Sequence, residues 1–479
     1  MRREFQVFAI LIALLPATGY SQDWHSHASD GTSENDTLVV EDSFAPADLE
    51  NTSSGVQSNL VSMAYGVEDE MACCSCCEHG GSGCNCLWCR KELTGDWWGR
   101  RTCLAEHGIV YKASITQFYQ GVTSGGAEQR FRYGDKIDQY FILDSGKLGL
   151  WEGGKLIIHG DTQLGQSSIA DAVGFAPANT AMLTPLIGQP RTAITHFQFE
   201  QDLGHGYAGT VGKFNFLDLW TAFYPDYGRG LDGFMNTSSI AFLNVVPTLP
   251  LVFDGAGLIK AGDKGIEAAV MFLDTNNIPT VSGLNTLFDN GGTVLGIYRF
   301  FTEFGGLPGS HLFAGTWSST EFESFEPAGW ITSRFGGVFA GLPSPKADSW
   351  LAAYVLDQTL WMDPCNKQRK VWLTSTWGIA DPETSPFAWM GTASIEAIGF
   401  NSNREHDRMG ISYWYNGVSD DLKALVPVLG IQDVQGGEVY YNAEITPWFH
   451  LTADLQVIQP ALDSDDTAVV FGLRGKIDL

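Results

Sequence analysis

The residues with the clearest chemical potential in this 479-residue chain are cysteines near the N-terminus. Seven of the nine cysteines fall within the stretch CCSCCEHGGSGCNCLWC, residues 73–89. Thiolates separated by two residues can hold zinc, and thiolates this close together can also bind copper(I). An oxidising compartment would instead favour disulfides, and an even local count suits a small bridged unit of undefined connectivity. The candidate metal ligands or disulfide partners are Cys73, Cys74, Cys76, Cys77, Cys84, Cys86, Cys89 and Cys103.

Neither a metal nor a disulfide in this stretch would by itself make the protein an enzyme. The sequence contains no Gly-x-Ser-x-Gly nucleophile motif and no His-Glu-x-x-His zinc motif, and its ten histidines are scattered. We therefore expect no catalytic activity and no cofactor for the main function. A metal at the cysteines is the one cofactor question that stays open.

The segments around the cysteines indicate where they are placed. Arg2 and Arg3 precede an apolar stretch at residues 7–17, and small residues permit cleavage before Gln22, which predicts a secretory signal. Residues 22–70 contain eleven acidic and no basic residues, so we expect a disordered acidic leader. The expected division is a signal peptide at 1–21, the leader at 22–70, a Cys-rich segment at 71–92 and the main folded domain at 93–479.

The balance of charge excludes one class of partner. The 28 basic and 55 acidic residues give a net charge of 28 − 55 = −27, whereas nucleic-acid binding needs clustered Lys and Arg. After the signal, no segment offers the ~20 consecutive apolar residues of a transmembrane helix. We expect neither a nucleic-acid partner nor a membrane-spanning helix.

Beyond residue 100, stretches of about ten residues alternate apolar and polar side chains between clusters of Gly, Pro, Asn and Asp. In the last stretch Phe471 and Leu473 share one face, and Arg474 and Lys476 share the other. This period of two predicts about sixteen strands. They are expected near 109–120, 137–148, 154–164, 192–203, 207–217, 265–275, 292–303, 310–320, 331–341, 349–360, 371–381, 388–400, 408–416, 438–446, 448–457 and 467–478.

A secreted soluble β-protein would also alternate, so the pattern must be tested against a membrane setting. Aromatic residues crowd the expected strand ends, as the two interfaces of a transmembrane barrel require. These residues are Trp97, Trp98, Trp151, Trp350, Trp361, Trp372, Trp377 and Trp448. The fold class that we expect is all-β, a transmembrane antiparallel barrel of about sixteen strands with an aqueous channel and a disordered, Cys-rich N-terminal extension.

Three blocks of sequence resemble a known family. The stretch LTGDWWGRRTCLAEHGIVYKASITQFYQG, residues 93–121, resembles the opening of the carbohydrate-selective porins of the OprB type, in which a short helix precedes the first strand. RTAITHFQFEQDLGHGYAGTVGKFNFLD, 191–218, is similar to a pair of the family's strands, and EVYYNAEITPWFHLTADLQVIQPA with GLRGKIDL is similar to its closing hairpin. The chain ends in Leu479 where such barrels tend to end in Phe. The resemblance implies passive uptake of sugars through a channel narrowed by inward loops.

Candidate solute contacts lie in the second block and in the loop that follows it. His196 and Glu200 should face the lumen opposite outward Phe197, and Lys213 should face the lumen from the next strand. The loop DLWTAFYPDYGRGLDGF combines rings, an acid and a guanidinium, as a constriction for sugars would. Lumen charges that pair to stabilise the barrel, and rings that pack the loop on itself, are the alternative. The candidates are His196, Glu200, Lys213, Trp220, Tyr224, Asp226, Tyr227 and Arg229.

Two other functions remain open at this point. The barrel could pass other small solutes, such as anions or peptides, or it could be a structural barrel of the envelope, anchored by its Cys-rich segment. In each case we expect an outer-membrane location, contact with membrane lipid and a periplasmic N-terminal extension. That extension could act as a plug, spacer or tether. A homotrimer is a further expectation that the sequence does not test.

Overall fold

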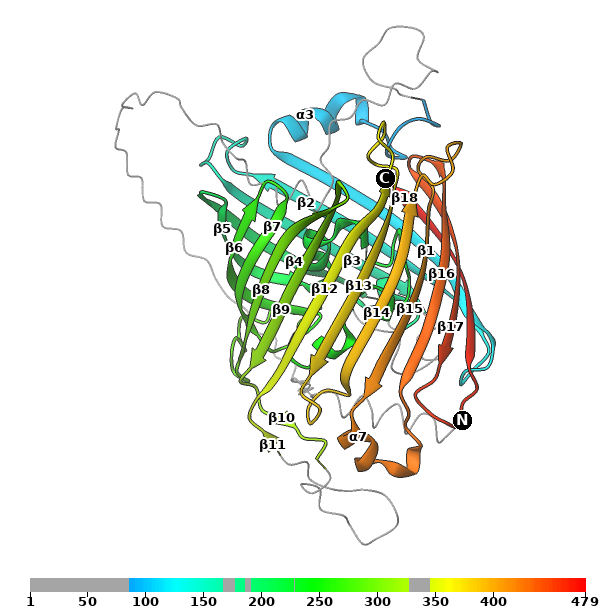
Figure 1. Cartoon of the computed structure of the whole chain (residues 1–479). Coiled ribbons are helices and arrows are strands. Elements are labelled where there is room, and N and C mark those ends of the chain that lie inside the picture. The colour runs from blue at the N-terminus through cyan, green and yellow to red at the C-terminus, as the bar shows by residue number, and fades with distance from the viewer. Residues whose placement is uncertain (1–85, 167–176, 186–190, 228, 327–344) are drawn as a thin grey trace, which may run out of the picture.

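The computed structural model describes residues 86–166, 177–185, 191–227, 229–326 and 345–479. Sixteen strands form one closed antiparallel barrel (Figure 1), which confirms the expected fold class. The barrel strands are β1 (Ile109–Ser124), β2 (Phe131–Asp144), β3 (Gly154–Gly165), β4 (Arg191–Gly204), β5 (Tyr207–Asn215), β6 (Val252–Gly262), β7 (Gly265–Asp274), β8 (Gly292–Phe304), β9 (Leu307–Ser318), β12 (Ser349–Met362), β13 (Lys370–Ala380), β14 (Phe387–Ile398), β15 (Arg408–Val418), β16 (Val434–Thr446), β17 (Phe449–Gln459) and β18 (Ala468–Asp478).

Each barrel strand pairs with the strands before and after it, and β1 pairs with β18 to close the ring. In the closing pair Ile115 lies opposite Ile477. Closure leaves no open sheet edge, which is the condition for a sheet in lipid. Two short strands outside the ring, β10 (Phe322–Glu323) and β11 (Pro345–Lys346), pair with each other, so β9 pairs directly with β12.

The observed strands differ from the expected ones at two places. The prediction omitted β6, because this strand carries apolar side chains on both faces: Leu258 is exposed outside, and Ile259 is buried inside. The alternation on which the prediction depended is therefore weak there. The expected strand at 331–341 lies outside the described residues, as do the signal peptide, the acidic leader and residues 71–85.

The outer face of the barrel is apolar and carries aromatic residues near both rims. On β1, Tyr119 is exposed between the buried side chains of Phe118 and Gln120. Because neighbouring strands are antiparallel, Trp151 and Trp361 lie near the rim that also holds α3, and Trp317 and Trp350 lie near the other. Trp372 differs from this expectation, since it is buried and faces inward beneath the charges of Lys370 and Arg408.

The helices are short and lie at the rims or in the lumen. No helix in the described ranges is long and apolar enough to cross a membrane. The helical segments are η1 (Trp97–Gly99), α3 (Arg100–Glu106), η2 (Thr180–Leu183), α5 (Phe216–Phe223), η3 (Pro225–Tyr227), α6 (Thr237–Ile240), η4 (Leu243–Val245), α7 (Asp420–Leu425) and η6 (Pro427–Leu429).

The short helix α3 precedes the first strand, as the resemblance implies. Asp96 caps it from three residues before the N-cap Gly99, because Asp96 Oδ1 accepts from the Thr102 N–H at 2.8 Å. Gly108 ends the turn after it with φ +84°, and an added Cβ would lie 2.8 Å from the Asp144 carbonyl oxygen. Only glycine fits this position without strain.

Candidate functional site

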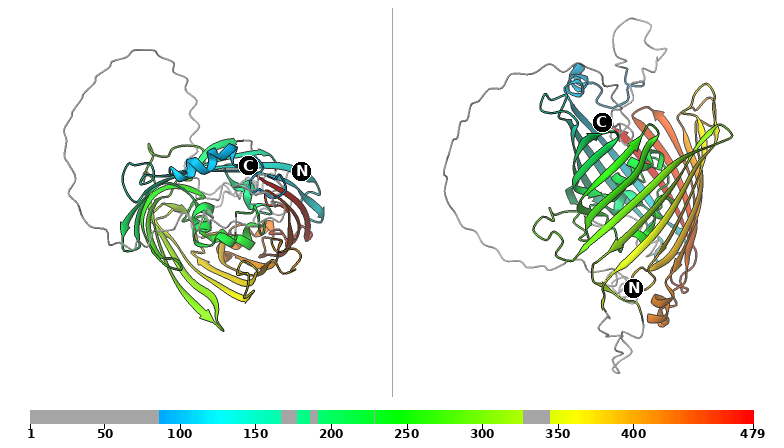
Figure 2. Two further views of the ribbon diagram at one scale, coloured as in Figure 1. Left: turned by 90° about the horizontal axis from the view of Figure 1, so that it is seen from above. Right: turned by 60° about the vertical axis from the view of Figure 1, so that its left-hand side comes forward.

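The connection between β5 and β6, residues 216–251, folds inside the barrel (Figure 2), and we call it the inward loop. It turns inward at once because Asn215 caps α5, accepting at Oδ1 from the Leu217 N–H at 3.0 Å. Asn236 caps α6 in the same way, accepting from the Ser238 N–H at 2.9 Å. The local sequence therefore starts both helices of this loop.

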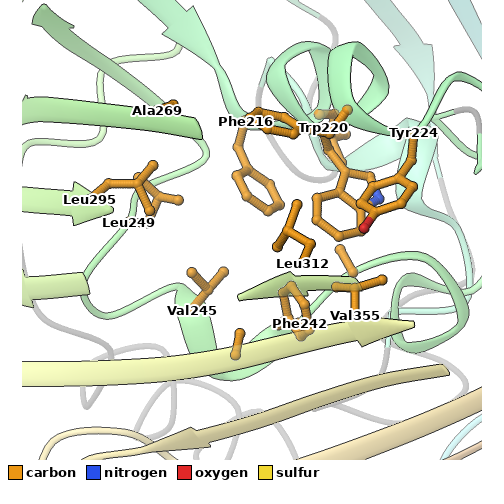
Figure 3. Close-up of a cluster of buried hydrophobic side chains, with 14 of the residues drawn as sticks. Phe216, Trp220, Tyr224, Phe242, Val245, Leu249, Ala269, Leu295, Leu312 and Val355 are labelled. Carbon is orange, nitrogen blue, oxygen red and sulfur yellow. The ribbon is translucent and has the colours of Figure 1, made fainter. Parts of the chain in front are cut away.

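One side of the inward loop is apolar and packs against the inner wall (Figure 3). The ring of Trp220 lies 5.0 Å from that of Tyr224 and 5.5 Å from that of Phe242. These rings join Leu295 and Leu312 of the wall in a single buried cluster. Trp220 and Tyr224 therefore hold the loop in place, which is the packing role that the sequence analysis left open.

The other side of the loop carries a buried charge cluster. Arg229 Nη2 lies 2.9 Å from Asp138 on β2, and Arg229 Nε lies 3.2 Å from Asp218 on α5. His159 bridges the same two carboxylates, with Nδ1 2.8 Å from Asp218 and Nε2 2.9 Å from Asp138. Tyr140 donates to Asp218 Oδ1 at 2.9 Å and also contacts Arg229. This cluster joins the inward loop to β2 and β3.

Asp218 remains charged within this cluster. Burial would raise its pKa, but the charge of Arg229 and the contact with His159 outweigh burial and hold the pKa of Asp218 well below its usual range. A carboxylate at this position is therefore a permanent partner for Arg229.

Further polar contacts fasten the inward loop around the whole lumen. Asp226 binds Lys370 of β13 at 2.6 Å, and Asp232 binds Lys476 of β18 at 2.9 Å. Glu438 of β16 accepts from the backbone N–H of Asn236 at 3.1 Å. Because these partners lie on separate parts of the wall, the loop crosses the channel and narrows it.

A polar cavity of about 310 Å³ lies between the inward loop and the walls formed by β1, β2 and β18. Three basic and three acidic side chains line it, together with the Tyr140 ring and the Ser114 hydroxyl. The charges of the lining therefore balance. The six charged side chains are those of Lys112, Asp138, Arg229, Asp232, Lys476 and Asp478.

Of the residues predicted to contact solute whose side chains the structure describes, Arg229 alone lines this cavity. His196 and Glu200 face inward as expected, but both are buried, and His196 Nε2 lies 2.9 Å from Gln198 Oε1. Asp226 does not line the cavity and instead pairs with Lys370 of β13. Tyr227 belongs to η3, and its side chain lies outside the described part of the structure.

The prediction that Lys213 faces the lumen is wrong. Lys213 lies opposite Phe197, which is 44% exposed on the outer face, and Val211, two residues earlier, is 50% exposed. Because side chains alternate along a strand, Lys213 points outward and Phe214 points inward. Lys213 Nζ donates to the carbonyl of Val281 at 2.8 Å, in the connection between β7 and β8. The β7–β8 connection therefore gives the Lys213 ammonium a hydrogen-bond acceptor on the outer face. The sequence alone places this ammonium in the water of the lumen.

Cys73, Cys74, Cys76, Cys77 and Cys84 lie outside the described residues. Cys86 and Cys89 flank a tight turn, in which the N–H of Cys89 donates to the carbonyl of Cys86 at 3.1 Å. Cys103 is exposed on α3. The disulfide and metal alternatives both stay predictions.

The candidate residues missed several members of the cavity. Asp138 and Tyr140 alternate with outward Phe141 on β2, and Lys476 and Asp478 share one face of β18. The alternation itself was visible in the sequence for β18. The alternation does not show which parts of the wall the inward loop leaves uncovered. These residues could therefore not be chosen as solute contacts from the sequence.

A second reading of the charged residues is a metal site. One carboxylate oxygen each from Asp138 and Asp161 and one nitrogen of His159 lie within 4.8 Å of one another. Lys136 already lies 2.8 Å from Asp161, and Arg229 lies 2.9 Å from Asp138. Lys136 and Arg229 thus already neutralise the two carboxylates that a metal ion would bind. We therefore propose no metal at this group.

A closed sixteen-stranded barrel with an apolar outer face and a polar channel narrowed by an inward loop is an outer-membrane porin. Residues 129–479 match the family described as "Carbohydrate-selective porin, OprB family", and the chain belongs to this family. The protein is therefore a channel for carbohydrates and not an enzyme. No curated protein matches its sequence.

Solved structures share the fold at low sequence identity. The high-pH structure of OprB from Pseudomonas putida has a TM-score of 0.68 and 18% identity, and the match covers 82% of this chain and 99% of that one. The low-pH structure of the same protein has a TM-score of 0.50 and 14% identity with the same coverage. At this level of identity the likeness supports the fold alone.

Proposed function

We propose that sugars of monosaccharide type diffuse through this barrel and form brief hydrogen bonds in the polar cavity beside Arg229. The observation that carries this proposal is the balance of three basic and three acidic side chains around the cavity. A sugar hydroxyl both donates and accepts hydrogen bonds, so paired lysine, arginine and aspartate side chains can serve it from both sides. Several weak contacts admit a solute and still release it.

The same balance does not favour an anion channel. A porin selective for anions needs an excess of Lys and Arg at its narrow point, and this lining has none. We expect weak ion selectivity, with a reversal potential near zero in a salt gradient across a planar bilayer. A strong preference for anions would support the alternative function instead.

The test compares two strand lysines that lie on opposite faces of the barrel wall. In liposome swelling with a graded series of sugars, Lys476→Met should change the rate for sugars near the size limit, because Lys476 lines the cavity. Lys213→Met should leave that rate unchanged, because Lys213 points outward. Equal effects of both variants, or none from Lys476→Met, would remove the cavity from the solute path.

We also propose that the rim with α3 and the C-terminus faces the periplasm, together with the N-terminal extension. The turns at this rim are short, such as those at 204–207, 262–265 and 304–307, whereas the connections at 274–292 and 318–349 at the opposite rim are long. Outer-membrane barrels place short turns in the periplasm. A protease-sensitive tag inserted at 282–286 should be cleaved in intact cells, and a tag at 263–264 should be protected.

A further inference from the structure

Hydrogen bonds join the segment 86–107, which precedes the first strand, to the rim of the barrel. The indole of Trp448, in the turn between β16 and β17, donates to the carbonyl of Leu87 at 2.6 Å. The Leu93 N–H donates to the carbonyl of Asp478 at 2.7 Å, and Arg101 Nη2 donates to that of Leu479 at 2.7 Å. The segment therefore runs along the rim, over the ends of β17 and β18 to β1.

Contacts of Trp97 place this segment on the outer side of the rim. The Trp97 ring lies 5.9 Å from that of Tyr111 on β1, and Tyr111 lies 4.7 Å from Phe141 on β2. Phe141 is 42% exposed on the outer, lipid-facing wall. The aromatic band of the barrel thus continues from β2 and β1 onto the segment before α3, away from the lumen.

The backbone then directs a second tryptophan away from the barrel. Trp97 and Trp98 have φ values of 47° and 60°, a region that bulky residues seldom adopt. Trp97 packs against the wall and beneath Arg101, whose guanidinium lies 4.5 Å from its ring, whereas Trp98 is 96% exposed. Trp88 is 68% exposed on the same segment, and Leu104 is also exposed.

Large exposed apolar side chains beside exposed basic ones are typical of a segment that lies in a membrane interface. Lys91 and Arg100 are exposed basic residues here, and they follow Trp88 and Trp98 by three and two residues. Exposing the apolar rings of Trp88 and Trp98 to water costs free energy. The headgroup layer of a membrane accepts both the ring and the indole N–H.

We propose that residues 86–107 form an interfacial anchor, in which Trp88, Trp98 and Leu104 enter the phospholipid headgroup layer and Lys91 and Arg100 contact lipid phosphates. The anchor extends the aromatic girdle of the barrel beyond its strands. The turn Cys86–Cys89 lies on the same segment, so the Cys-rich stretch joins the barrel at the membrane surface rather than over the channel mouth.

The test uses the full chain in phosphatidylcholine vesicles whose acyl chains carry bromine near the headgroup. The difference in fluorescence between the wild type and Trp98→Phe isolates the emission of Trp98, and brominated lipid should quench it at least twofold. Trp372→Phe is the matched control, because Trp372 is buried in the lumen, and its emission should be unaffected. Emission of Trp98 that resists brominated lipid but is quenched by aqueous iodide would overturn the proposal.

A second measurement needs no variant. In the same vesicles, trypsin should cleave wild-type protein after Arg100 at least tenfold more slowly than after Lys264, which is exposed in the turn between β6 and β7. Equal cleavage at both sites would also overturn the anchor. Both outcomes are independent of sugar transport, because neither measures the channel.

Discussion

Arg229 is the residue through which the inward loop meets the wall beside the polar cavity. It is buried between Asp138 and Asp218 and contacts Tyr140, so one side chain joins the loop to β2. Removing one partner of a buried ion pair costs ~3–5 kcal/mol, because the remaining charge stays unpaired. This residue was a candidate from the sequence, but its position as an anchor is a finding of the structure.

We expect Arg229→Met to release the loop from β2 and widen the channel. Asp138 and Asp218 would keep only the imidazole of His159 between them, and the loop can relieve their repulsion by moving into water. Single-channel conductance in planar bilayers should rise, and block of the current by sugar should weaken. Lys264→Met, a change of the same charge in an exposed turn, is the control. An unchanged conductance in Arg229→Met would contradict the anchoring role.

Asp218 gives a prediction for pH. Its pKa is held well below the usual range, so its stabilising effect is complete above the unfolded value of ~3.9 and declines only as the pH falls toward the lower folded value. Between pH 7 and pH 4 the carboxylate should stay ionised. The ratio of wild-type to Asp218→Asn conductance should therefore be constant across this range, and a ratio that approaches one near pH 4 would show that Asp218 titrates there.

At the scale of elements, the inward loop depends on two kinds of packing. Its charged side is joined to β2, β13 and β18, and its apolar side packs on the wall that includes β8 and β9. The inner faces of β8 and β9 carry Leu295 and Leu312, which would be wet in an open channel. The apolar inner wall is thus a docking surface for the loop, and this explains why alternation is weak in β6.

We expect Trp220→Ala to loosen the apolar side of the loop. Truncating a buried aromatic residue costs ~3–5 kcal/mol through lost contacts and the cavity that remains. Liposome swelling should then admit larger sugars than the wild type does. Trp317→Ala, which removes an outward ring of the same type, should leave the size limit unchanged. A shift in both variants would indicate a general loss of barrel stability.

At the scale of the whole molecule, the barrel and the Cys-rich stretch are separate structures. The ring closes between β1 and β18 without any cysteine, and Cys103 and Cys365 are exposed outside the strands. We therefore expect reductant and EDTA, alone or together, to leave sugar-induced swelling unchanged. Loss of swelling after either treatment would show that a disulfide or a metal supports the channel. A homotrimer also stays a prediction, which sedimentation in detergent can test.

The sequence by itself determined the barrel, its approximate size and the family, because alternation and aromatic position follow from local covalent geometry and from lipid on one side of the wall. The same rule explains why Arg474 and Lys476 share one face of β18 and lie inside, while Phe471 lies on the outer face.

Only the tertiary structure decided which residues line the cavity. Trp220 and Tyr224 are covered by the wall, Lys213 is turned outward beneath a connection, and Asp138 and Lys476 are left beside the cavity. The physical reason is that the inward loop crosses the channel through contacts with strands that are far apart in sequence. The alternation of side chains within one strand contains no information about the loop that covers that strand.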